Sequence, residues 1–271
     1  SSTPLDLGQI SANTMSIDAS YALTRKASID FGAPYVASKY DGSAPHVPTL
    51  DDGAFHGAMQ DLRLAMRYQL VSGRTAVTPF AAVSVPSHSY AYFAHSAVGR
   101  DLREFSVGAF AAHIMDEVVP GAFVQAKYSY SFTQQVLDIP HNHSNLDLEL
   151  GYFINPRLRT FGLAAGQVTH GGLDAGPDYV FTPEQWQHHD QIVQSNFVAA
   201  GAGGAFSMND SMDVFGSFMR DVYVKNGHAI ARSVTFGVSW TIDRRGGARG
   251  PMHEARREKG ALVRCTCQKA G

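Results

Sequence analysis

The sequence predicts an all-β fold: an antiparallel, up-and-down transmembrane β-barrel of about twelve strands, the first of which is either missing or incomplete. Three observations support this prediction. Apolar and polar side chains alternate with a period of two in almost every segment. Many of these segments run to roughly ten residues, whereas soluble strands average about five or six. Short and long connections alternate strictly along the chain, as they do in outer-membrane barrels.

The first half of the chain contains six predicted strands. They cover residues 15–23, 29–35, 62–70, 76–85, 103–114 and 122–132. In the first strand Met15, Ile17 and Tyr21 alternate with small or polar residues, and residues 24–27 turn the chain. In the third strand the apolar residues alternate with Asp61, Arg63 and Arg67, and in the sixth with Lys127 and three other polar residues. Each strand therefore has one face suited to lipid and one suited to water.

The second half supplies five more strands, at residues 145–152, 158–169, 191–206, 212–222 and 234–242. The clearest pattern is that of residues 145–152, where Leu146, Leu148 and Leu150 oppose Asp147 and Glu149. Tyrosine and tryptophan residues lie toward strand ends on the apolar faces, as in the girdles at membrane interfaces. They are Tyr21, Tyr68, Tyr130, Tyr152 and Trp240. No helix is required by the pattern.

The connections define two ends of the predicted barrel. Short turns fall near residues 24–27, 71–75, 116–120, 154–157 and 207–211, and longer loops near 39–57, 86–102, 133–144, 170–190 and 223–229. The last strand should run toward the periplasm, so the first visible strand runs the same way. Because bacterial single-chain barrels normally have an even strand number, one upward strand is expected either upstream of Ser1 or within residues 5–12.

Bulk composition limits the class of protein. Only 17% of residues are charged and the net charge is −2, which argues against nucleic-acid binding by the whole chain. There is no apolar run near the ~20 residues of a membrane-spanning helix. We expect residues 15–242 to form the barrel and residues 1–14 to be a lead-in or a partial strand. Residues 243–271 carry eight basic and three acidic residues and are expected to be a disordered tail.

Four stretches resemble a known family. They are residues 29–36 (IDFGAPYV), 77–86 (VTPFAAVSVP), 145–153 (NLDLELGYF) and 226–240 (NGHAIARSVTFGVSW), and the His189–Asp190 pair before a glycine-alternating strand is also similar. The family comprises bacterial outer-membrane transporter proteins linked to phenol degradation pathways. The resemblance covers about residues 15–242. It implies a barrel that passes small, aromatic molecules, and it implies no catalytic residues.

Seven charged residues on the polar faces are predicted to line the lumen. They are Asp61, Arg63, Arg67, Lys127, Asp147, Glu149 and Arg159. Mixed charges facing a pore can set ion selectivity and a transverse field. The alternative is that these residues pair with one another and plug a narrow barrel, because twelve strands lie between filled and open barrels.

Other candidate sites are weaker. His141, His143, His170, His188 and His189 fall in predicted outer loops, but their spacing matches no closed metal motif, so no metal or other cofactor is expected. A hydrolase trio of Ser144, His143 and Asp147 is conceivable, but no G-x-S-x-G elbow is present and the residues alternate between faces. We therefore do not expect an enzyme. The glycines of residues 201–204 are interpreted as packing positions, and Cys265 and Cys267 as incidental.

The leading functional hypothesis is a passive outer-membrane channel for small molecules, surrounded by outer-membrane lipids. A closed scaffolding barrel that binds a protein partner through its loops or tail is the second hypothesis. The third is an outer-membrane enzyme that modifies lipids. A soluble β-sandwich remains the alternative fold, because alternation alone fits both folds.

Overall fold

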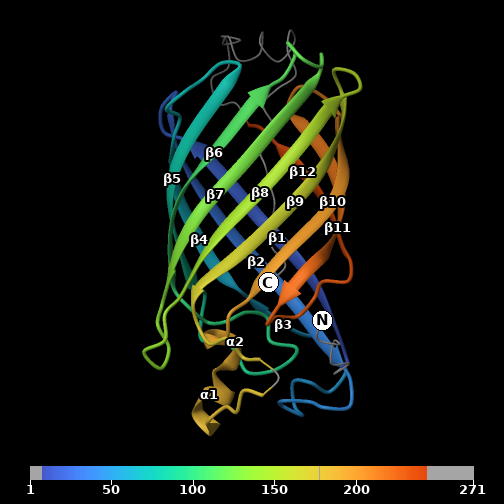
Figure 1. The fold of residues 1–271 in the computed structure, drawn as a ribbon. Helices are drawn as coiled ribbons and strands as arrows, with labels where there is room; N and C mark the ends of the chain where they lie inside the picture. The colour runs from blue at the N-terminus through green and yellow to red at the C-terminus, as the bar shows by residue number, and fades with distance from the viewer. Residues whose placement is uncertain (1–7, 177, 243–271) are drawn as a thin grey trace.

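The computed structural model describes residues 8–176 and 178–242, and all of the strands within them belong to one antiparallel sheet (Figure 1). Its strands are β1 (Gln9–Ala22), β2 (Ala27–Asp41), β3 (His56–Met59), β4 (Asp61–Tyr68), β5 (Thr75–Pro86), β6 (Glu104–Ile114), β7 (Ala122–Thr133), β8 (His141–Phe153), β9 (Leu158–Gly171), β10 (Asn196–Ser207), β11 (Met212–Lys225) and β12 (Ser233–Trp240). The all-β prediction is confirmed.

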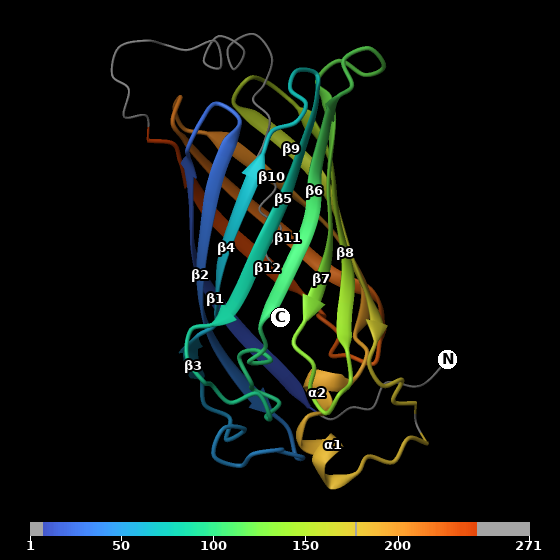
Figure 2. The same cartoon turned by 90° about the vertical axis from the view of Figure 1, so that its left-hand side faces the viewer.

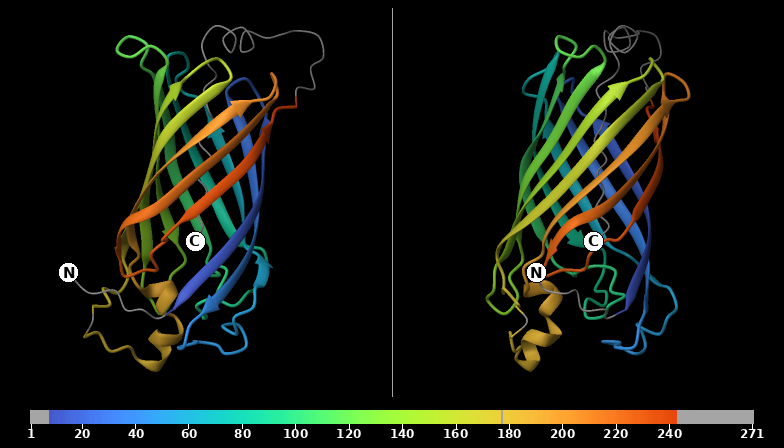
Figure 3. Two further views of the ribbon diagram at one scale, coloured as in Figure 1. Left: turned by 90° about the vertical axis from the view of Figure 1, so that its right-hand side faces the viewer. Right: turned by 45° about the vertical axis from the view of Figure 1, so that its right-hand side comes forward.

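Consecutive strands are hydrogen-bonded neighbours, so the topology is up and down. Strands β3 and β4 both pair with β2, and Gln60 between them donates its N–H to the Pro34 carbonyl at 2.9 Å. They therefore act as one interrupted strand, and the sheet has the eleven long strands that the alternation predicts. The sheet curls until β12 and β1 lie on facing edges (Figure 3). Within the described residues these two edges are not paired with each other.

The N-terminal strand differs from the prediction. It begins at Gln9, before Met15, and its pairing with β2 continues without a break from Gln9↔Asp41 to Ala22↔Ser28. Residues 9–12 therefore extend the first strand and do not form a separate upward one. Ser11 and Asn13 lie on the outward face but are polar, so they interrupt the apolar pattern. The sequence therefore does not indicate that this segment belongs to the strand. The rest of the range 5–12 lies largely outside the described residues.

The two ends of the curled sheet are unlike (Figure 2). One end, the turn end, has the five short connections. The other end, here called the mouth, carries long loops over residues 42–55, 87–103, 172–195 and 226–232 and the shorter loop 134–140. β1 and β12 both run from the mouth to the turn end, so they are parallel to each other.

The loop before β10 contains two short helices, which the alternation did not predict. They are α1 (Pro183–Gln187) and α2 (His189–Ile192), and β10 consequently starts at Asn196 and not near residue 191. The Thr182 side chain accepts a hydrogen bond from the Gln185 N–H, and the Gln185 side chain bonds back to the Thr182 N–H. This capping box, with Pro183 at the first helical position, starts α1. No helix in the described part of the chain is long and apolar enough to cross a membrane.

The sheet has an apolar outward face and a polar inner face. Outward residues include Leu150, which is 59% exposed, and Trp240, which is 69% exposed. Near the turn end several inner-face glycines lie beneath phenyl rings of a neighbouring strand. A Cβ on Gly151 or on Gly203 would lie 2.1 Å or 2.4 Å from the ring of Phe123 or Phe161, respectively. Glycine at these positions lets large rings lie flat along the inner wall.

Candidate functional site at the mouth and inner wall

All seven predicted lumen residues lie on the inner face of the curled sheet. On β4, Asp61, Arg63 and Arg67 alternate with the exposed apolar residues of the outward face. The same alternation turns Lys127 on β7, Asp147 and Glu149 on β8, and Arg159 on β9 inward. The sequence thus predicted which face these residues occupy.

The inner-face charges pair along the wall. The Arg67 guanidinium lies 2.5 Å from the Asp30 carboxylate on the neighbouring strand β2, and it also donates to the Ser20 hydroxyl at 3.1 Å. Lys127 on β7 lies 3.4 Å from its register partner Asp147 on β8. Because these pairs join adjacent strands, they brace the wall without bridging the lumen.

The phenyl rings of Phe80 and Phe110 lie beneath cations of the inner face. Arg67 and Lys127 lie over the ring of Phe110, at 5.6 and 6.0 Å from its centroid, and Arg63 lies 6.0 Å over Phe80. The rings themselves are in contact, with centroids 5.1 Å apart. Cation–π contacts of this kind hold a positive side chain against a surface. The cations of β4 and β7 are therefore fixed on one side of the inner wall.

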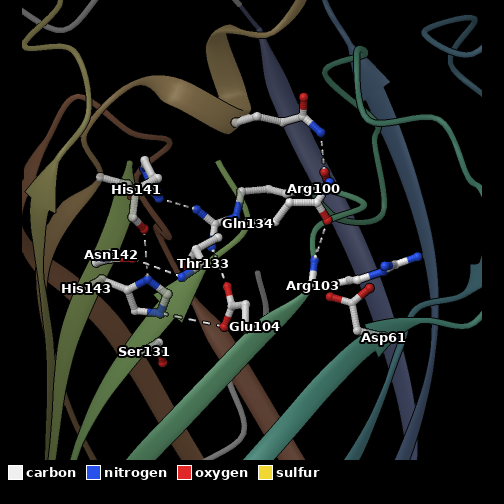
Figure 4. Close-up of polar contacts among 12 residues, drawn as sticks. Asp61, Arg100, Arg103, Glu104, Ser131, Thr133, Gln134, His141, Asn142 and His143 are labelled. Carbon is white, nitrogen blue, oxygen red and sulfur yellow. Dashed lines mark hydrogen bonds and ion pairs between the residues drawn. The ribbon is translucent and has the colours of Figure 1, made fainter. Parts of the chain in front are cut away.

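At the mouth, Arg100 in loop 87–103 joins three parts of the molecule (Figure 4). Its guanidinium bonds the Nδ1 atom of His141 on β8 at 2.8 Å and the Glu104 carboxylate on β6 at 2.9 Å. Its backbone carbonyl accepts a hydrogen bond from Gln191 of α2 at 2.6 Å. One arginine thus ties the loop to two barrel strands and to the helical loop.

The hydrogen bonds of His141 define its tautomer. Its Nε2 atom lies 2.7 Å from the Val193 carbonyl, which can only accept, so Nε2 carries the proton. Nδ1 must then be the acceptor for Arg100, and the imidazole is neutral. His141 therefore acts as a fixed connector between loop 87–103 and loop 172–195. His143, two residues on, is buried with Nε2 3.8 Å from Glu104.

A second connection runs between loops 42–55 and 87–103 through Asp51. One carboxylate oxygen accepts hydrogen bonds from the N–H groups of His46, Val47 and His95 at 2.9, 3.2 and 3.2 Å. The other accepts from the N–H and hydroxyl of Ser96 at 2.9 and 2.8 Å. Burial alone would raise the pKa of Asp51, but these hydrogen bonds outweigh it and hold the pKa below its ordinary value.

Loop 87–103 is also fixed to the inner wall directly. The Tyr90 hydroxyl donates a short hydrogen bond to Asp61 and accepts one from the Asp101 N–H at 3.1 Å. Gln60, at the break between β3 and β4, donates to the Val98 carbonyl at 2.7 Å. Burial and the bond to Asp61 raise the pKa of Tyr90, so the hydroxyl remains a donor. The loop is accordingly packed inside the mouth and is not free in solvent.

Four histidines from four loops, one of them in loop 87–103, lie together at the mouth. His46 stacks on His95 with ring centroids 3.7 Å apart, His189 lies edge-on to His46 at 5.1 Å, and His228 lies edge-on to His95 at 6.1 Å. Aromatic side chains surround them: Tyr40, Phe93, Phe181 and Trp186. We call these eight residues the ring cluster. It closes loops 42–55, 87–103, 172–195 and 226–232 onto one another.

The surroundings of His46 and His228 in the ring cluster favour neutral imidazoles. Burial, together with the neighbouring His95 and His189, lowers the pKa of His46 to about 4, although Asp190 and Asp51 oppose this. Burial also lowers the pKa of His228, with Asp190 raising it and His95 and His189 lowering it further. Stacked imidazoles at these distances cannot all be protonated without mutual repulsion.

The predicted placement of several histidines was wrong. His141, His143 and His170 are in strands β8 and β9, because strand pairing continues beyond the apolar pattern. His188 and His189 do lie in a long loop, as predicted, where they belong to or flank the short helix α2. In the described residues, no group of three or more histidine, cysteine or acidic side chains is arranged to hold a metal ion. Cys265 and Cys267 lie outside the described residues.

The conceivable hydrolase trio does not assemble. Ser144 faces outward, where its hydroxyl lies 2.8 Å from His170 Nε2 and 3.1 Å from the Tyr128 hydroxyl. His143 and Asp147 face inward and contact Glu104 and Lys127 instead. Among the described residues, no carboxylate lies within ion-pairing distance of His170. Ser144 and His170 therefore lie on the outward face, beside the aromatic side chains of Tyr128 and Tyr130.

Sequence reasoning missed the residues that organise the mouth: Asp51, His46, His95, Arg100 and Gln191. None lies in a strand, and each has at least one partner that is distant in sequence. The only local signal was the high histidine content of the chain, 12 residues in all.

Comparison with solved structures identifies the fold. An outer membrane channel from Pseudomonas putida F1 matches with a TM-score of 0.58 and 12% sequence identity, over 84% of this chain and 80% of that one. The NanC porin matches at 0.49 and 12%, over 87% and 97% of the two chains. OmpT, an outer membrane protein of Vibrio cholerae, matches at 0.40 and 9%, over 84% and 89%.

No protein-family model and no curated protein matches the sequence. The matches to the NanC porin and to OmpT are too weak to support a conclusion, and the match to the Pseudomonas putida F1 channel shows the fold alone. The chain therefore has the fold of an outer-membrane β-barrel.

Proposed function

We propose that this protein is a passive channel for small molecules in the outer membrane of a Gram-negative bacterium. The observation that carries the proposal is the contrast between the two faces of the sheet: an apolar outward band and a polar inner wall on which Arg67 pairs with Asp30 and Lys127 with Asp147 between neighbouring strands. Such a wall leaves polar groups facing the lumen, as a water-filled path requires. The outer membrane channel from Pseudomonas putida F1 has the same fold, which is compatible with the proposal.

Conductance in planar bilayers tests the proposal. Ser217 and Phe218 are neighbours on β11 with opposite orientations, inner and outward. We expect stepwise conductance from the wild type, a reduced conductance for Ser217→Trp, and an unchanged one for Phe218→Trp. Absence of stepwise conductance from folded protein would refute a channel.

The substrate class is a finer proposal: solutes that carry an aromatic ring. The ring cluster at the mouth supports it, because rings bind planar solutes by stacking. Benzylammonium and cyclohexylmethylammonium provide a matched pair of probes with the same charge and similar size. Benzylammonium should be the more permeant cation, and Trp186→Leu should reduce the difference. Equal permeability of the two cations would contradict an aromatic preference.

A closed scaffolding barrel is the second candidate, and the packing of the mouth supports it. Ile192 of the helical loop is 0% exposed, and Leu102 and Ser96 of loop 87–103 are each 3% exposed. A scaffold would conduct no ions and would capture a partner protein through these loops or residues 243–271. A channel would conduct without a partner, so the bilayer measurement separates the two. We do not propose an enzyme, because the Ser144 side chain faces outward whereas those of His143 and Asp147 face inward.

We also propose that one more strand completes the barrel. β1 and β12 are parallel to each other, and each has an edge without a strand partner in the described residues. Unpaired backbone groups are costly in lipid, so an antiparallel strand between them would satisfy both edges. This would give the twelve strands expected from the sequence. Cysteine pairs placed across β1 and β12 should fail to cross-link if such a strand is present.

A further inference from the structure

We propose that Arg220 and Arg232 form a binding site for the phosphate group of a lipid in the outer leaflet of the outer membrane. The two arginines occupy neighbouring positions of the β11–β12 hairpin, on the mouth side. The site belongs to the lipid-facing surface of the barrel, so it does not depend on whether the lumen conducts.

Arg220 is an exposed basic residue on the outward face of β11. Phe218, two residues before it on the same face, is 46% exposed, and Val222, two residues after it, is 62% exposed. Among the described residues, Arg220 has no hydrogen bond or ion pair with a carboxylate. Because a guanidinium is always protonated in proteins, a positive charge faces the lipid there between apolar neighbours.

Arg232 lies beside Arg220 in the hairpin. β12 begins one residue after Arg232, and its first residue pairs with Met219, one residue before Arg220. On the other side of the two arginines the Asp221 N–H donates to the Ile230 carbonyl at 2.9 Å. Arg232 is also exposed, and like charges at opposed positions of a sheet are destabilising. An anion bound by both guanidinium groups would remove this repulsion.

The other outward charges of the strands are placed differently. In the described strands, alternation turns three further charged side chains outward, all among the last three residues of their strands at the mouth: Lys39, Asp41 and Lys225. Lys39 lies 5.5 Å over the ring of Phe55, and Lys225 lies 2.8 Å from the carboxylate of Asp174. Arg220, by contrast, lies five residues before the end of β11.

The depth of Arg220 brings it near the outer margin of the apolar band. It is eight residues from Met212, which pairs with Trp240 at the turn end. At ~3.3 Å per residue and a strand tilt of about 40°, Arg220 lies roughly 20 Å above Trp240, within an apolar band about 25 Å tall. Its long side chain can extend from there to the headgroups. Long loops of outer-membrane barrels are extracellular, so these are headgroups of the outer leaflet.

The chemistry of the pair selects a lipid phosphate. Each guanidinium can donate two parallel hydrogen bonds to phosphate oxygens. The exposed apolar side chains around the pair, Phe218, Val222 and Val234, would contact the acyl chains of the same molecule. A free phosphate ion would bind the arginines alone, whereas a phosphate-bearing lipid would use both the charged and the apolar parts of this surface.

Binding of diphosphoryl lipid A to the purified, folded full chain in detergent micelles tests the proposal, with native mass spectrometry as the measurement. We expect wild type to bind this lipid, and Arg220→Gln/Arg232→Gln to bind it about tenfold more weakly, because charge-assisted hydrogen bonds to phosphate are lost. Arg220→Lys/Arg232→Lys keeps the charge but not the bidentate geometry, so its affinity should lie between the two.

Arg25→Gln/Lys26→Gln is the matched control, because it removes two exposed positive charges from the turn end. Its affinity for diphosphoryl lipid A should equal that of wild type, and millimolar inorganic phosphate should not displace the lipid. Wild-type affinity in either the glutamine or the lysine variant of Arg220 and Arg232 would overturn the proposal. So would an equal loss of affinity in the control, and displacement by inorganic phosphate would assign the pair to a free anion instead.

Discussion

The two ends of this barrel are built by different means. At the turn end the same local arrangement occurs three times: the N–H of Leu23, Ile154 or Met208 donates to the carbonyl four residues later at 2.9 Å. The next residue, Thr24, Asn155 or Asn209, accepts backbone hydrogen bonds within the turn, at 2.9–3.1 Å. Each turn is thus determined by about five consecutive residues, as Asx-type turns are.

At the mouth, hydrogen bonds connect residues that are distant in sequence. Ser96 binds Asp51, His141 binds the Val193 carbonyl, and Gln191 binds the Arg100 carbonyl, across 45, 52 and 91 residues respectively. Such contacts form only after the barrel has brought its loops together. The contrast implies that substitutions at the mouth should loosen several loops at once, whereas substitutions in a turn should act locally.

The largest effect is expected for Asp51→Ala. It removes the acceptor for two hydrogen bonds within loop 42–55 and for three hydrogen bonds from His95 and Ser96 of loop 87–103. Leaving these donors unsatisfied should lower the free energy of loop opening by about 3 kcal/mol, since a charged hydrogen bond contributes roughly 1.5–3 kcal/mol. Amide hydrogen exchange in residues 94–97 should accelerate by about two orders of magnitude.

The matched control is Asp52→Ala. Asp52 is the neighbouring carboxylate, but its bonds to His56 and to the Ala54 N–H are exposed and remain within one segment. Exchange in residues 94–97 should stay at the wild-type rate. Equal acceleration in both variants would mean that Asp51 does not join the two loops.

A somewhat smaller effect is expected for Arg100→Met. The substitution keeps much of the apolar stem but removes the donors to His141 and Glu104, and it leaves both acceptors half-buried or buried. Loop opening should become easier by about 2 kcal/mol, with faster exchange in both loop 87–103 and α2. Arg103→Met, an exposed neighbour, is the control, and unchanged exchange in Arg100→Met would refute the connecting role of Arg100.

The sequence predicts the strands and the turn end of the barrel better than it predicts the mouth. Strand alternation predicted all eleven long strands and the inward orientation of Asp61, Lys127 and Glu149, because a period of two is a local property of a strand. The short turns were also located correctly, since Thr24 and Asn155 are turn formers in their own segments.

The mouth could not be predicted in this way. Asp51 occurs in Asp51-Asp52-Gly53, which is typical of a solvated turn, and nothing near it identifies Ser96 as its partner. The histidines selected from sequence were neighbours in sequence, such as His188 and His189, whereas the ring cluster combines His46, His95, His189 and His228 from four loops. Pairing between loops depends on barrel geometry, which alternation does not specify.

Acid should loosen the mouth while leaving the turn end intact. The pKa of His46 is about 4 in the closed cluster and near 6.5 when the loops separate. Above pH 6.5 both forms are neutral, so this contribution to closure is fully present. As the pH falls from 6.5 to about 4, only the separated form takes up a proton, and opening becomes progressively favoured. Below about pH 4 the effect no longer grows.

Tryptophan fluorescence can follow this change, because Trp186 stacks on His189 and the chain has only one other tryptophan, Trp240. In a Trp240→Phe background, the emission of Trp186 should change between pH 6.5 and 4. His46→Phe retains a stacking ring without a titratable group and should reduce the change. An identical pH profile with and without His46 would assign the effect to other groups.

The smallest effect is expected at the turn end, for Asn155→Ala. The Asn155 side chain accepts hydrogen bonds from the N–H groups of Arg157 and Leu158, both at 2.9 Å. Their loss should lower the free energy of unfolding in detergent by about 1 kcal/mol, while hydrogen exchange at residues 94–97 should be unchanged. Asn155→Asp keeps the acceptor and should retain most of the stability. Faster exchange at the mouth in Asn155→Ala would show that the two ends are coupled through the strands, contrary to their separate construction.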